Sequence, residues 1–151
     1  MARPLPEFGV TIAFFALYGL ANAAVAHARH GEGADLVDEL AALFPSATDR
    51  DSARIDFPLI GAAVFALGVA GLVHARLAPD DAAFLLCAAL RFNYVRASPS
   101  MNWQAGVDLV EQRSPGAIAR ADQRVGDRQA PELLAEIRDL LRDRRDAFHG
   151  R

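Results

Sequence analysis

The hydrophobic positions of this chain gather in two long runs without a charged residue. The first, FGVTIAFFALYGLANAAVAHA, covers Phe8–Ala28, and the second, FPLIGAAVFALGVAGLVHA, covers Phe57–Ala75. A helix of about 20 residues is about 30 Å long, which is the thickness of the hydrocarbon core of a bilayer. Both runs place apolar side chains on every helical face, as is typical of a helix in nonpolar surroundings. The pattern therefore predicts two transmembrane helices.

The segments around these runs predict shorter helices. In the connecting loop, LVDELAALF forms an amphipathic stretch that Asp35 can cap and Pro45 ends. After the second run, Pro79 and two carboxylates resemble a helix start, followed by AAFLLCAALRFNYV at 82–95. That run is too short to span, so we expect an interfacial helix, and a third crossing stays open as an alternative.

The C-terminal region reads as a helical tail. A weak helix is expected near 107–112, and Ser114 and Pro115 indicate the start of a short helix that ends near Gly126. The last helix begins at Pro131 and carries apolar residues at the three- and four-residue spacing of a single stripe, at Leu133, Leu134, Ile137, Leu140 and Leu141. Self-association through this stripe and packing on the tail's other helices are equally compatible with the pattern.

Taken together, these elements predict an all-α fold with two parts. Residues 1–78 form a transmembrane hairpin whose connecting loop, 29–56, is acidic, and residues 79–151 form the interfacial helix and the extramembrane tail. Two crossings place both termini on one side of the membrane, and the arginine balance favours the cytoplasm. Antiparallel spans would also hold His27 and His74 at opposite membrane faces, too far apart to share a metal ion.

Charge and composition exclude several functions. The 16 basic residues are all arginine and the net charge is -3, with acids and arginines interleaved in the tail, so the chain lacks a nucleic-acid footprint. One cysteine, Cys87, cannot form an intramolecular disulfide. No nucleotide-binding, hydrolase or zinc motif occurs, so we expect no enzyme, no metal and no cofactor.

Small residues on the two runs are the candidate helix-packing positions. Gly19 and Ala23 form a small-xxx-small pair on the first run, where Asn22 can donate a hydrogen bond across helices. The second run offers a narrow face of Ala62, Ala66, Ala70 and Gly71. Packing within the chain and binding to a partner are both open for these positions. The expected partners are membrane lipid and other membrane protein subunits, or a second copy of this chain.

One local likeness bears on function. The nine residues LLAEIRDLL, Leu133–Leu141, resemble the cytoplasmic helix that ends large-conductance mechanosensitive channels, although the Arg-Gly-Asn and Val-Asp-Leu-Ala sequences of that family do not occur here. The resemblance implies a homo-oligomeric channel with a C-terminal helical bundle as an alternative. The favoured interpretation is an accessory or assembly subunit, multi-pass in the cell membrane. A soluble all-helical domain is the third possibility.

Overall fold

The computed structural model describes residues 5–49, 51 and 54–148, with side chains from residue 14 onward. Over these ranges the chain is helical and contains no strand, so the all-α prediction is confirmed. The elements are α1 (Leu5–Ala28), α2 (Ala34–Ala47), α3 (Phe57–Val73), α4 (Pro79–Arg91), the 3-10 turn η2 (Pro99–Met101), α5 (Trp103–Arg113), α6 (Ala117–Val125), α7 (Ala130–Asp143) and α8 (Arg145–Phe148).

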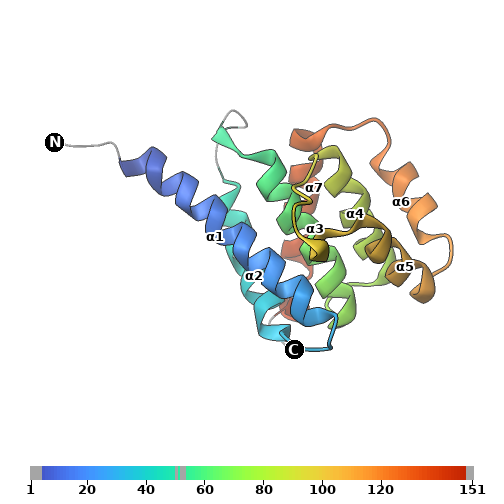
Figure 1. Ribbon diagram of the computed structural model, residues 1–151. Helices are drawn as coiled ribbons and strands as arrows, with labels where there is room; N and C mark the ends of the chain where they lie inside the picture. Colours follow the sequence, from blue (N-terminus) through green and yellow to red (C-terminus); the bar gives the residue numbers. More distant parts are fainter. Residues whose placement is uncertain (1–4, 50, 52–53, 149–151) are drawn as a thin grey trace.

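Helix α3 lies at the centre of the body, with α1, α2, α4 and α5 packed around it (Figure 1). Every residue from Leu59 to Leu72 is buried. The second predicted membrane span is therefore corrected: its apolar faces contact the protein's own helices, not lipid. The sequence pattern could not separate the two cases, because a helix enclosed by protein and a helix enclosed by lipid are both apolar on every face.

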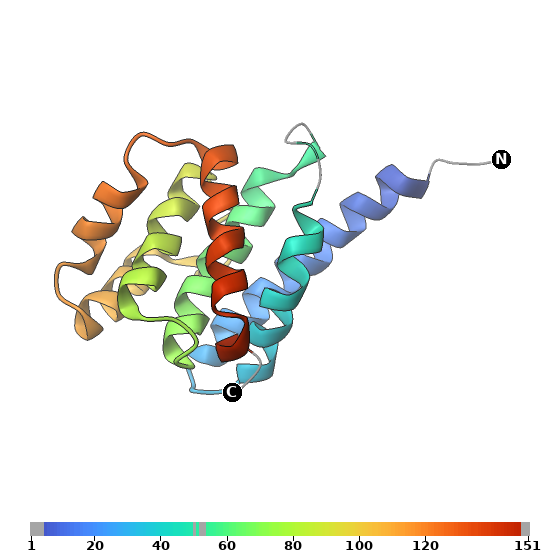
Figure 2. The same ribbon diagram turned by 180° about the vertical axis from the view of Figure 1, so that it is seen from behind.

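Helices α1 and α3 run in the same direction, because α2 carries the chain back between them (Figures 1 and 2). Their C-terminal ends consequently lie close together. The imidazole Nε2 of His74 lies 2.9 Å from the carbonyl oxygen of Glu32, and the Nδ1 atom of His27 lies 3.9 Å from the carboxylate of the same Glu32. The antiparallel hairpin, with the two histidines at opposite ends, was thus a wrong prediction.

Helix α4 is a second core helix and packs on α3. All residues from Ala82 to Ala89 are buried, so the expected interfacial position of 82–95 is also corrected. The helix begins at Pro79 as predicted, with Asp80 and Asp81 in its first turn. One hydrophobic core contains residues of α1 through α4 and of the C-terminal helices, so it extends across the expected boundary between 78 and 79.

Helices α5, α6 and α7 cover the outer side of α4 (Figure 2). Arginine side chains join these layers: Arg124 of α6 contacts Asp81 of α4 at 3.3 Å and Glu136 of α7 at 2.9 Å. Its guanidinium also lies 4.1 Å from the ring centroid of Phe84, a cation–π contact. This linkage between α4, α6 and α7 pairs residues far apart in the sequence, and the sequence pattern did not predict it.

Within the described part of the chain, none of the helices combines the length and the apolar character that crossing a bilayer requires.

Candidate functional site

The C-terminal half of α1 is held on the body by one apolar face. Its buried side chains recur every three or four residues, and they are Phe14, Leu17, Ala21, Ala24, Val25 and Ala28. This face packs on α2 and α3. The sequence of α1 does not reveal the face, because the opposite side of the helix is also uncharged.

A polar clasp fixes α1 to the segment before α5. The Ser100 hydroxyl donates to Asn22 Oδ1 at 3.0 Å, and Arg29 donates to the carbonyl oxygen of Ser100 at 3.1 Å. Asn22 Nδ2 itself donates to the carbonyl oxygen of Tyr18 in its own helix. Asn22 therefore makes a hydrogen bond to another segment, as the sequence suggested. It accepts this bond instead of donating it, and its partner lies in the 3-10 turn η2 and not in a helix.

From residue 14 onward, the other face of α1 is open and carries no acidic residue, lysine or arginine. Phe15 is 60% exposed, and a Cβ atom added at Gly19 would meet no atom within 4 Å. Ala23 is half-buried on the same side. The N-terminal part of α1 also extends beyond the body as a projecting helix (Figure 1). The predicted small-residue pair of the first run thus lies on an accessible surface.

The corresponding residues of α3 are internal. Ala62, Ala66, Ala70 and Gly71 are buried, where close approach of neighbouring segments uses their small size. One very close approach is at Gly61, whose added Cβ atom would lie 2.5 Å from the Cβ atom of Phe92 and 2.9 Å from that of Tyr94. The small residues of α3 therefore serve packing within this chain.

The predicted stripe of the last helix is internal as well. The structure buries all five of its side chains, Leu133, Leu134, Ile137, Leu140 and Leu141. They pack toward α4 and α2 as part of the common core. The helix starts as expected, with Pro131 in its first turn and the Glu132 carboxylate accepting from the backbone N–H of Gln129 at 3.1 Å.

No metal centre forms among the described residues, where no group of three or more histidine, cysteine or acidic side chains converges. Cys87 lies in the α4 core with its Sγ atom 3.8 Å from the carbonyl oxygen of Ile118. Burial raises the pKa of its thiol to about 11, so Cys87 is a packing residue and not an activated nucleophile.

Comparison with known proteins adds no assignment: no family model, curated protein or solved structure matches this chain. The open face of α1 is thus the candidate functional site. It includes Phe15, Gly19 and Ala23, together with the projecting N-terminal part of the helix.

Proposed function

We propose that the protein is a membrane-associated accessory subunit that attaches to its membrane through α1. In this proposal the N-terminal part of α1 inserts among lipid chains without crossing the bilayer, and the helical body remains at the surface. The single observation that carries the proposal is the extension beyond the body of α1, which has no charged residue from Phe8 to Ala28 (Figure 1).

The distribution of apolar residues on α1 favours lipid as its surroundings. A helix that docks in a groove of another protein has one apolar stripe and a polar opposite face. In α1, Phe14 is buried against the body while the adjacent Phe15 is exposed, so large aromatic side chains lie on both sides of the helix. Aromatic and aliphatic side chains in such a position gain free energy by entering the interfacial region of a membrane.

The open face offers a contact for a membrane partner. Gly19 and Ala23 allow another helix to approach α1 closely, which is how helices associate in lipid, where no hydrophobic force drives them together. A second crossing is not part of the proposal, because α3 is enclosed by the body. The homo-oligomeric channel is not proposed either, since the stripe that would join its subunits is buried.

The test is flotation of the full-length protein with lipid vesicles. Phe15→Glu places a charge on the face that would enter lipid, and we expect it to reduce the vesicle-bound fraction severalfold. Leu90→Glu is the matched control, since Leu90 is an apolar residue of α4 with 37% exposure, and it should leave flotation unchanged.

Two results would contradict the proposal. One is a wild-type protein that stays unbound on both neutral and anionic vesicles. The other is equal loss of binding in both variants, which would indicate general destabilisation and not a role of α1.

A further inference from the structure

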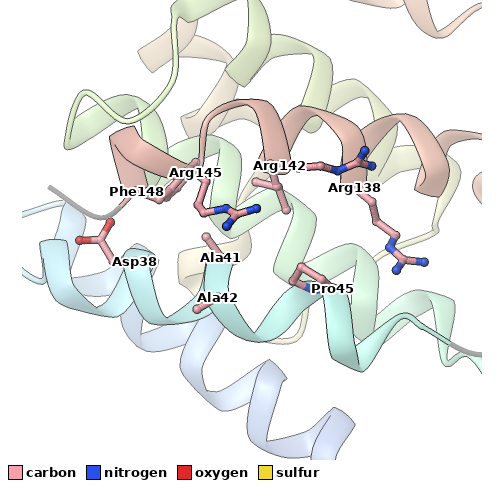
Figure 3. A pocket seen from close by; sticks show the side chains of 9 residues that line it. Asp38, Ala41, Ala42, Pro45, Arg138, Arg142, Arg145 and Phe148 are labelled. Atoms are coloured by element: carbon pink, nitrogen blue, oxygen red, sulfur yellow. The ribbon is translucent and has the colours of Figure 1, made fainter. Parts of the chain in front are cut away.

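A groove with a volume of about 390 Å³ lies between α2 and the C-terminal helices α7 and α8 (Figure 3). Its base is apolar and includes Ala41, Leu141 and Phe148, which are buried. Exposed Ala42 and Pro45 complete the α2 wall. A volume of this size is in the range of small-molecule sites, which are typically about 300–1,000 Å³.

The opposite wall is cationic. Arg138, Arg142 and Arg145 line the groove and are spaced by four and three residues, so they follow one side of the C-terminal helices. Arg138 and Arg142 lie four residues apart on α7, where like charges repel one another. Figure 3 shows Arg145 reaching across the groove toward Ala41.

These arginines are weakly neutralised by the protein. Among the described residues, Arg138 forms an ion pair with Asp49 at 3.9 Å, and that carboxylate is 78% exposed. Arg142 pairs with Asp139 on the exposed outer side of α7. Arg145 makes no hydrogen bond or ion pair with any of the described residues.

The single acid among the described lining residues, Asp38, is already fully engaged. Both of its carboxylate oxygens accept from Arg76 at 2.9 Å, and Arg76 also donates to the carbonyl oxygen of His74 at 2.9 Å. Asp38 is therefore not available to balance the arginine wall. The groove combines an apolar base with a net positive rim.

We propose that this groove binds an aliphatic carboxylate, with the carboxylate on Arg145 and the acyl chain on Ala41, Leu141 and Phe148. A guanidinium presents two parallel N–H donors to the two oxygens of a carboxylate, and such charge-assisted pairs are the stronger hydrogen bonds in proteins. The apolar base removes the acyl chain from water. This site is separate from the α1 surface and does not depend on the proposed membrane attachment.

The test is isothermal titration calorimetry of the full-length protein with octanoate, and with acetate and 1-octanol as probes that lack the chain or the charge. We expect octanoate to bind and both truncated probes to bind at least about tenfold more weakly. Octanol binding as tightly as octanoate would overturn the role of the arginines, and acetate binding as tightly would overturn the role of the apolar base. Absence of octanoate binding at millimolar concentration would overturn the proposal outright.

Variants locate the site. Arg145→Gln should weaken octanoate binding about tenfold, since it removes a charge-assisted contact. Ala42→Glu places a competing carboxylate beside the arginines on an exposed position of α2 and should abolish binding. Arg120→Gln removes the same charge from α6, on another side of the molecule, and should have no effect.

A second arginine tests for an alternative location. Arg113 lies at the edge of a different apolar crevice, which Phe65, Val69 and Gly106 line. Loss of octanoate binding in Arg113→Gln but not in Arg145→Gln would assign the anion to that crevice and overturn the proposal. Phe15→Glu should leave octanoate binding intact, so failure of this proposal and failure of membrane attachment are distinguishable.

Discussion

Helices α1 and α3 have nearly the same composition, but the rest of the protein buries α3 on all sides and α1 on one face only. Each derives from an uncharged run rich in alanine, glycine and phenylalanine. Around α3, helices lie on all sides and bury Leu59–Leu72 without interruption. Around α1 the body covers one face, and Phe15 and Gly19 face outward. The comparison teaches that apolarity on every face indicates nonpolar surroundings without specifying whether protein or lipid supplies them.

The largest expected effect comes from truncating equivalent aromatic residues. Phe65 of α3 is 1% exposed and its ring stacks on Tyr94 with centroids 4.9 Å apart. We expect Phe65→Ala to lower the free energy of unfolding by about 3–5 kcal/mol. Phe15→Ala should change it by less than about 0.5 kcal/mol. Urea unfolding followed by circular dichroism measures both, and equal losses would contradict the different environments of the two helices.

Alanine substitution of glycine should have opposite signs on the two helices. At Gly61 the new methyl group would overlap the Cβ atoms of Phe92 and Tyr94, and the repacking should cost about 1–3 kcal/mol, more than the gain in helix propensity. At Gly19 the methyl group meets open space, so Gly19→Ala should stabilise the protein by about 0.5–1 kcal/mol. Thermal unfolding decides the signs; a stabilising Gly61→Ala would place α3 outside the core.

Thiol labelling gives a smaller but more direct contrast. Because burial raises the pKa of Cys87 to about 11, the wild-type protein should react with a thiol reagent at pH 8 only after unfolding. Phe15→Cys should add one thiol that reacts at the rate of an exposed cysteine. Ala66→Cys, on the buried centre of α3, should add none under native conditions. Fast labelling at position 66 would contradict the enclosure of α3.

Low pH should weaken the contacts of α4, α5 and α6 that involve carboxylates before it weakens the contact between α1 and Ser100. Hydrogen bonds from the backbone N–H groups of Gly116 and Ile118 lower the pKa of Glu111, and a hydrogen bond from Arg120 lowers that of Asp80. Carboxyl groups whose pKa is lower in the folded state stabilise it above their unfolded pKa, and this contribution disappears as the pH falls through the folded pKa. Stability should therefore decline as the pH drops below about 4.5.

Glu136 also stabilises the folded state at neutral pH and loses this contribution as the pH falls. Burial alone would raise the pKa of Glu136, but hydrogen bonds from Arg128 and Arg124 lower it overall.

The pH dependence is measured as the urea midpoint of unfolding at each pH. We expect Glu111→Gln to make this midpoint fall less steeply on the acid side. An unchanged slope in that variant would show that the capping contact at α6 does not carry the effect. The clasp between Asn22 and Ser100 involves no carboxyl group and should not titrate.

Local elements followed from local residue patterns. The proline at the start of α4 and the one in the first turn of α7 mark the helix beginnings, since proline lacks the N–H that the first turn leaves unpaired. The boundaries of α2 were less accurate, because that helix continues through Pro45 to Ala47 and is capped by Gly33 instead of Asp35. Pro45 lies inside the last turns of the helix, where Phe44 and Ala47 are buried in the core.

Two sites were not predictable from the sequence. The arginine groove depends on the return of α7 and α8 alongside α2, about a hundred residues earlier in the chain, and on the pairing of Asp38 with Arg76. No short-range spacing encodes either contact. The same holds for the ionic linkage of Arg124 with Asp81 and Glu136.

The sequence by itself determined that the protein is helical, where α3, α4 and α7 begin to within one residue, and that two helices need nonpolar surroundings, because these properties depend on local propensity and on hydrophobic periodicity. Only the tertiary structure decided what those surroundings are. Enclosing α3 required α1 and α5 in addition to its sequence neighbours α2 and α4, whereas the described helices cover only one face of α1. Whether a helix is buried on one face or on all faces depends on which other helices pack against it. The hydrophobic pattern along the sequence does not contain that information.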